Sequence, residues 1–198
     1  ALPLAIKGRL TFEIDGVEKE VRIRRAHLEE DAGKLYHENG TTRVDLNRAG
    51  VPLLEIVSAP DMRSAEEARA YGEALRQILV YLGVNSGNME RGVMRFEANV
   101  SVRHLGSEQM EARHEIKNLN SFRALYESIL YEIDHQIAVL ESGGEIEQQT
   151  MGWNEMDGVT VPQRGKEFAP DYRYFPEPDI PPLEISRERV AQLRSQLP

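Results

Sequence analysis

Three consecutive carboxylates stand near the end of a strand-like segment early in the sequence. They are Glu29, Glu30 and Asp31, and Gly33 follows closely. Side-chain oxygens grouped at a strand end suit Mg²⁺, which prefers oxygen ligands and usually shares them with the phosphates of a substrate. A solvated acidic turn would produce the same pattern, and on these residues alone it is the simpler interpretation.

A fourth carboxylate, Glu55, interrupts the apolar segment 52–58. If this segment is a buried strand, a carboxylate within it needs a cation, a metal ion or hydrogen-bond donors. Glu55 could instead face solvent together with Leu53 and Val57, because alternate residues of a strand share one face. The segment itself favours neither interpretation over the other.

Polar side chains occupy every second position from 95 to 103, and apolar side chains fill the positions between them. The polar set is Arg95, Glu97, Asn99, Ser101 and Arg103. After a turn near Gly106, a second alternating segment carries Glu111, Arg113, Glu115 and Lys117 on one face. Pairing the two segments as a hairpin makes the polar faces coincide, with Arg103 opposite Glu111, Asn99 opposite Glu115, and Glu97 opposite Lys117.

Such a face of mixed charge is what a cradle for ATP or a carboxylate needs. The solvated face of an ordinary antiparallel sheet is the alternative, and these residues alone favour it slightly. Other enzyme signatures are absent from the sequence: no phosphate-binding P-loop, no dinucleotide fingerprint, no zinc-protease helix and no serine-hydrolase elbow. The five histidines show no ligand-like spacing.

The elements that must position these residues are strands in the first sixty residues and two long helices later. Strands are expected at 9–14, 17–28, 42–46 and 52–58, with a hairpin turn at Asp15-Gly16. Helices are expected at 64–82, where Ser64 and Glu67 form a capping box, at 121–141, and at 186–197. The expected apolar stripes are Ala68, Tyr71, Leu75, Ile78 and Leu82 on the first helix, and Phe122, Leu125, Ile129, Ile133, Ile137 and Leu140 on the second.

The order of these elements predicts an α+β fold, with a mostly antiparallel sheet and the helices packed on one side. We expect residues 1–185 to form one incomplete domain and residues 186–198 to begin a following helical segment.

The composition restricts the class of protein. The 198 residues carry 24 basic and 33 acidic side chains, a net charge of −9. Neutralisation of phosphates dominates the affinity of proteins for nucleic acids. Any nucleic-acid binding must therefore come from another part of the protein or a partner, or from one local basic patch on this chain. The absence of cysteine excludes disulfides and thiolate metal sites within this sequence. No apolar run is long enough to cross a bilayer, so we expect no membrane partner.

Five ordered segments carry a family resemblance over nearly the whole chain. They read HLEEDAGK (27–34), VDLNRAGVPLLEIVS (44–58), RFEANVS (95–101), EIKNLNSF (115–122) and DYRYFPEPD (171–179). In this order they resemble the B-subunit family of the tRNA-dependent amidotransferases, which act on misacylated Glu-tRNA(Gln) or Asp-tRNA(Asn).

The resemblance implies a glutamine-synthetase-like cradle, ATP and Mg²⁺ as cofactors, partner A and C subunits in a heterotrimer, and the tRNA acceptor end as substrate. In this family ATP phosphorylates the side-chain carboxylate of the misacylated amino acid, and ammonia from the A subunit then displaces phosphate. Glu30 and Glu55 resemble the family's metal-binding glutamates. The resemblance further implies catalytic roles for Glu97, Asn99, Lys117 and Asn118, and ATP-binding roles for Arg95, Ser101 and Asn120. A cytoplasmic protein, bacterial rather than organellar, is expected.

The sequence departs from the family pattern in two ways. Phe96 and Glu97 stand where the family has cysteine and aspartate. The family's opening Gly-Leu-Glu-Val-His segment, its zinc-binding cysteines, its helical domain and its tRNA-binding tail are missing. We therefore expect a fragment with little or no activity alone. The alternatives are a non-catalytic scaffold that docks the A and C subunits, and an unrelated ATP-dependent carboxylate–amine ligase.

Overall fold

The structure is a computed structural model that describes residues 2–163 and 181–197. Contacts divide the described residues into two units, one holding residues 3–163 and the other holding residue 2 and residues 181–197. The second unit contains α3 (Arg187–Arg194), whose N-cap Ser186 accepts a hydrogen bond from the Arg189 amide. This confirms the predicted third helix, although it ends before Leu197. None of the described helices has the length and apolarity needed to span a bilayer.

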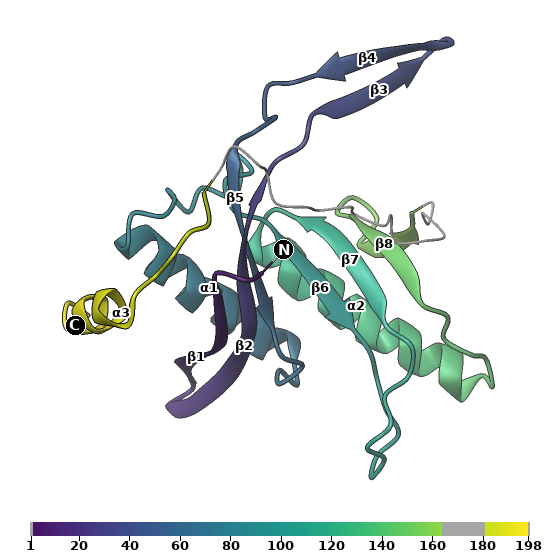
Figure 1. The fold of residues 1–198 in the computed structure, drawn as a ribbon. Helices are drawn as coiled ribbons and strands as arrows, with labels where there is room; N and C mark the ends of the chain where they lie inside the picture. The colour runs from purple at the N-terminus through teal and green to yellow at the C-terminus, as the bar shows by residue number, and fades with distance from the viewer. Residues whose placement is uncertain (1, 164–180, 198) are drawn as a thin grey trace. The chain divides into compact units, whose positions relative to one another are not determined.

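The first sheet has the order β1-β2-β5, and both of its strand pairs are antiparallel. Its strands are β1 (Ala5–Ile14), β2 (Val17–Glu30) and β5 (Pro52–Ser58) (Figure 1). The predicted turn is confirmed, because Asp15 and Gly16 both have positive φ, 51° and 78°, as a two-residue hairpin turn requires. β1 and β2 each extend further than predicted. β3 (Lys34–Glu38) and β4 (Thr41–Asp45) form a separate two-stranded sheet.

α1 (Ala65–Tyr81) packs on one face of the first sheet. The Ser64 side chain accepts a hydrogen bond from the Glu67 amide at 3.2 Å, which confirms the predicted N-cap. Tyr71, Leu75 and Leu79 of the helix meet Leu10, Phe12 and Val21 of the sheet. Two residues of the predicted stripe were assigned wrongly: Ile78 is 41% exposed and Leu82 is 57% exposed. The buried face follows the four-residue spacing from Tyr71 to Leu79, which turns Ile78 toward solvent.

This difference gives a direct stability test on adjacent residues. Replacing Leu79, which is 8% exposed, by Ala should lower the free energy of unfolding by about 2–5 kcal/mol, because it leaves a cavity beneath β1. Ile78→Ala should cost about 1 kcal/mol or less, since its side chain is largely outside the core. Urea unfolding of both variants measures the difference, and equal losses would contradict the packing described.

The second sheet has the order β6-β7-β8-β9 and is covered by α2 (Phe122–Glu141). Its strands are β6 (Phe96–Val100), β7 (His114–Leu119), β8 (Gln149–Asn154) and β9 (Val159–Pro162). The predicted pairing of Asn99 with Glu115 is confirmed. The hairpin is shorter than predicted: Arg103 does not face Glu111 in the ladder, and Glu111 instead donates its amide to the Val102 carbonyl at 2.9 Å. β8 and β9 were not predicted, and β8 pairs with β7 in parallel.

A buried polar cluster joins α2 to this sheet. The Glu132 carboxylate is fully buried and accepts hydrogen bonds from the Gln136 amide at 3.1 Å and the Thr160 hydroxyl at 2.8 Å. His114 Nδ1 lies 2.5 Å from the same carboxylate. Gln136 also donates to the Val100 carbonyl at 3.1 Å and accepts from the Val102 amide at 3.3 Å. Its amide therefore takes over the backbone hydrogen bonds at the point where β6 ends.

The polar cluster also corrects the predicted stripe of α2. Ile137 is 41% exposed, whereas Glu132 and Gln136 are fully buried. The predicted apolar stripe is wrong in the C-terminal half of α2, because paired polar side chains, rather than apolar ones, fill the space between this part of the helix and the sheet.

Candidate functional site

Three ligand-type side chains meet where β2 runs beside β5. His27 pairs directly with Glu55 across the two strands, and Glu29 follows His27 on the same face. One ligand atom from each of the three lies within 4.8 Å of the others. His27 Nδ1 is 3.7 Å from Glu29 Oε1. We call these three residues the β2–β5 cluster.

The chemistry of the β2–β5 cluster fits a divalent cation. The His27 Nε2 atom is buried and has no hydrogen-bond partner among the described residues, a state that calls for an explanation. One imidazole nitrogen and two carboxylates are donors that Mg²⁺ or Mn²⁺ accepts. Arg25 Nη2 lies 3.2 Å from Glu55 Oε2, so one cation already holds that carboxylate in place.

The structure does not bring Glu30 into the β2–β5 cluster. Glu30 pairs with Pro52 and is exposed, and alternation along β2 puts it on the face opposite Glu29. The predicted metal pair of Glu30 and Glu55 is therefore not assembled in this conformation, and the metal role of Glu30 stays a prediction. Glu29 is the neighbouring carboxylate that converges with Glu55.

Asp31, the last of the three consecutive carboxylates, links the end of β2 to the residues before β6. Its carboxylate is 2.9 Å from Arg48 Nε and 3.9 Å from Arg95 Nη2. Its backbone also bonds to Val51 and Gly50, at 2.8 and 2.9 Å, which fixes the turn that leads into β5. Through Asp31 the predicted ATP-binding residue Arg95 is held close to the strand that carries the β2–β5 cluster.

The polar face on β6 and β7 has Lys117 at its centre. Lys117 Nζ lies 3.2 Å from Glu97 and 3.3 Å from Glu115. Burial alone would lower the pKa of the Lys117 ammonium, but the carboxylates of Glu97 and Glu115 outweigh it and raise this pKa above its ordinary value. The predicted contact between Glu97 and Lys117 thus forms through side chains, although the ladder register shifts between Phe96 and Ala98.

The other predicted site residues have different surroundings. Asn99 is exposed opposite Glu115, and Asn120 is exposed immediately before Ser121, the N-cap of α2. The Ser101 hydroxyl donates to the Glu111 carbonyl at 2.5 Å, which fixes the loop after β6. Asn118 belongs to β7, but its side chain lies outside the described part of the structure. The segment 171–179 that contributes to the family resemblance is also outside the described residues.

Sequence reasoning did not identify His27 as a ligand, and it included Glu29 only among three consecutive carboxylates without selecting it as the partner of Glu55. The alternation of His27 and Glu29 was visible in the sequence, but it becomes a ligand pattern only once β5 is paired with β2 in the register that sets Glu55 beside His27. That register is a long-range property.

Nearly the whole sequence is similar to one family of known proteins. The family described as the GatB/GatE catalytic domain matches residues 1–191. The chain is 56% identical over 198 residues to the B subunit of the aspartyl/glutamyl-tRNA(Asn/Gln) amidotransferase of Herpetosiphon aurantiacus, covering 99% of this chain and 41% of that protein. It is 55% identical over 201 residues to the protein of the same name from Moorella thermoacetica, covering 100% of this chain and 42% of that protein. The chain thus spans about two fifths of the length of these relatives.

Proposed function

Because the chain belongs to the GatB/GatE catalytic-domain family, we propose that it carries the site at which a tRNA-dependent amidotransferase activates its aminoacyl-tRNA substrate. The similar relatives are named as the B subunits of enzymes for aspartyl- and glutamyl-tRNA, which supports this substrate class. The same name supports a multi-subunit enzyme, in which we place partner A and C subunits. These relatives come from bacteria, so we propose a bacterial cytoplasmic location.

The proposed reaction has two steps. A side-chain carboxylate oxygen of the misacylated amino acid attacks the γ-phosphorus of ATP, ADP leaves, and an acyl phosphate forms. Ammonia supplied by the A subunit then attacks the acyl carbon, phosphate leaves, and the nitrogen loses a proton to give the amide. The first step brings two anions together, so positive charge must be placed around them. The acyl phosphate must also be enclosed, since water would otherwise compete with ammonia.

The observation that carries this proposal is the convergence of His27, Glu29 and Glu55, whose ligand atoms lie within 4.8 Å of one another. Mg²⁺ held by these residues would neutralise the charge that develops on the phosphate oxygens. Arg95 and Lys117 are the cations suited to orient phosphate and carboxylate groups. Lys117 keeps its proton at neutral pH, because its raised pKa lies above an already alkaline value.

The remaining residues of the polar face retain the roles that the family resemblance implies. Glu97, Asn99 and Asn118 are proposed to contact the reacting groups, and Ser101 and Asn120 to support ATP. Since the Ser101 hydroxyl donates to the Glu111 carbonyl, its oxygen could still accept a hydrogen bond from a ligand.

Metal binding by two neighbouring glutamates tests this proposal. In the complex, Glu29→Gln should weaken Mn²⁺ binding, followed by electron paramagnetic resonance, on the order of 10–100-fold, because a ligand loses its charge. Glu30→Gln separates the two assignments: if the β2–β5 cluster holds the metal, this variant should bind Mn²⁺ as the wild type does. Weaker binding by Glu30→Gln alone would support the assignment from the sequence and contradict the β2–β5 cluster. Unchanged binding in both variants would overturn the metal centre.

A further inference from the structure

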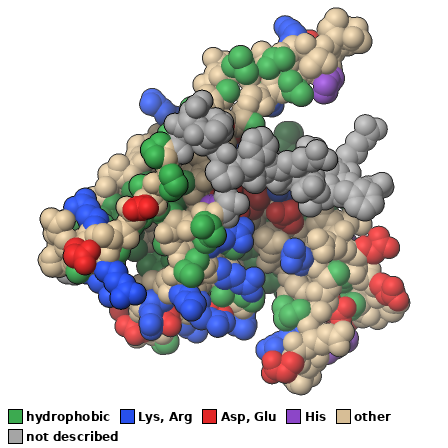
Figure 2. Space-filling model, in the orientation of Figure 1, with side chains coloured by type: hydrophobic (Ala, Val, Ile, Leu, Met, Phe, Trp, Pro, Cys, Tyr) green, Lys and Arg blue, Asp and Glu red, His purple; other side chains and the backbone are tan. Residues whose placement is uncertain are grey.

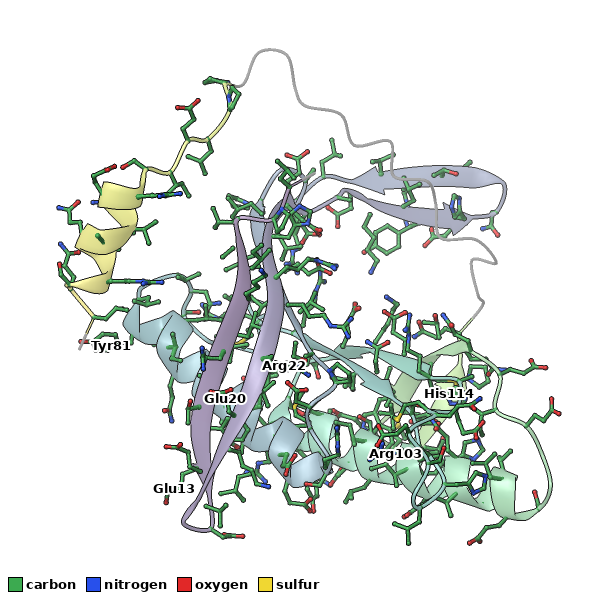
Figure 3. All side chains as sticks on the ribbon, turned by 60° about the horizontal axis from the view of Figure 1, so that its bottom comes forward. Glu13, Glu20, Arg22, Tyr81, Arg103 and His114 are labelled. Atoms are coloured by element: carbon green, nitrogen blue, oxygen red, sulfur yellow. The ribbon has the colours of Figure 1, made fainter. Side chains whose placement is uncertain are left out.

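A cationic hollow lies on β1 and β2, away from the β2–β5 cluster. It has a volume of about 500 Å³, and the charged residues that line it are Lys7, Arg9, Glu20, Arg22 and Arg24. Figure 2 shows Lys and Arg side chains gathered over this part of the first sheet. Figure 3 labels Glu20 and Arg22 on β2. We call this feature the β1–β2 hollow.

Two of the four cations already have carboxylate partners. Arg9 lies 3.5 Å from Glu20, and Arg22 holds Asp61 through two side-chain hydrogen bonds of 2.9 and 2.6 Å. The hydrogen bond from Arg22 lowers the pKa of Asp61 to about 2, so this pair is fixed at neutral pH. Lys7 and Arg24 have no ion pair among the described residues. The hollow therefore has an excess of positive charge on a chain whose net charge is −9.

The backbone is irregular where these two cations stand. Lys7 has a φ of 58°, in the left-handed region that residues other than glycine rarely adopt. The register of β2 against β5 shifts between Ile23 and Arg25, which makes Arg24 the extra residue. Bulges and positive φ outside turns cost stability and are over-represented at functional sites. Both irregularities occur at the cations that lack a carboxylate partner.

The hollow and the β2–β5 cluster lie on the same face of the first sheet. Ile23 and Ile56 pack against the core beneath α1, so Arg22, which precedes Ile23, lies on the other face. Past the bulge, Arg25, His27 and Glu55 alternate with Ala26 and Ile56 and also lie on that other face. Arg24 and His27 are three residues apart on β2, roughly 10 Å along the strand.

We propose that the β1–β2 hollow binds the phosphodiester backbone near the aminoacylated end of the tRNA, an inference that rests on the proposed function. Lys and Arg contacts to phosphates position a nucleic acid without reading its sequence. Backbone phosphates held here would bring the attached amino acid toward the β2–β5 cluster on the same face. No aromatic ring lines the hollow, so within the described structure it offers no surface on which an adenine could stack.

The test uses the double variant Lys7→Gln/Arg24→Gln in the complex assembled with a full-length B subunit. Affinity for tRNA is measured by fluorescence anisotropy over a range of salt concentrations. Two lost phosphate contacts should weaken binding roughly tenfold at moderate salt and make the slope of log affinity against log salt about 1.5 less steep. The control Arg69→Gln/Arg123→Gln removes the same charge from α1 and α2 and should leave both values unchanged.

Two results would overturn the hollow as an RNA site. One is a wild-type affinity and salt slope in the double variant. The other is a raised KM for ATP with unchanged tRNA affinity, which would assign the hollow to the nucleotide instead. Amide formation is assayed separately on the wild type, so a failure of the proposed function is distinguished from a failure of the hollow.

Discussion

Replacing Glu55 by Gln should lower tRNA-dependent amidation by at least about 100-fold in the complex, because the substitution keeps the size of the side chain but removes its charge. Glu55 stands directly opposite His27 and is the point at which β5 joins the β2–β5 cluster. Losing this carboxylate also leaves Arg25 without its partner at 3.2 Å, which alters the charge beside the cluster. Initial rates of amide formation at saturating ATP and Mg²⁺ measure the effect.

Glu18→Gln is the matched control for this prediction. Glu18 is an exposed carboxylate on β2, at the turn end of the strand, so its loss removes the same charge from the same strand. Its rate should stay within about twofold of the wild type, as expected for a surface substitution away from the site. Near-normal amidation by Glu55→Gln would contradict the metal centre and favour a non-catalytic scaffold that docks the partner subunits.

The largest expected effect on stability is at Glu132. Glu132→Ala should lower the free energy of unfolding by about 3–5 kcal/mol, because it leaves His114, Thr160 and Gln136 without the carboxylate that all three contact. His114, labelled in Figure 3, comes from β7, and Thr160 comes from β9, so the loss loosens both strands from α2.

Chemical unfolding followed by circular dichroism measures this loss. The control is Glu127→Ala on the same helix, whose carboxylate forms an exposed pair with Arg123 at 2.8 Å and whose loss should cost less than about 1 kcal/mol. A cost below that value for Glu132→Ala would show that the buried polar cluster does not join α2 to the sheet.

Local signals in the sequence predicted the local structure well. The Asp15-Gly16 turn and the N-cap Ser64 are determined by a few adjacent residues, and both are present as predicted. Non-local features were missed. β8 is short, and its pairing in parallel with β7, which precedes α2 in the sequence, is a long-range contact. The burial of Glu132 likewise depends on partners from other strands.

In the candidate site too, a local signal identified some residues, whereas others depend on long-range strand pairing. Glu55 was identifiable because a carboxylate inside an apolar segment needs a partner. The choice between Glu29 and Glu30 depends on which face of β2 looks toward Glu55, and adjacent residues of a strand face opposite sides. The composition of the segment cannot decide this, whereas the pairing of His27 with Glu55 does.

Transfer of oxygen from substrate to phosphate tests the central claim most directly. The complex would be given tRNA carrying glutamate or aspartate with ¹⁸O in its side-chain carboxylate, and the phosphate released during amidation would be analysed by mass spectrometry. An acyl phosphate passes one carboxylate oxygen to phosphate, so we expect one ¹⁸O in each phosphate from the wild type and no transfer above background from Glu55→Gln. Unlabelled phosphate formed together with amide by the wild type would contradict the proposed activation step.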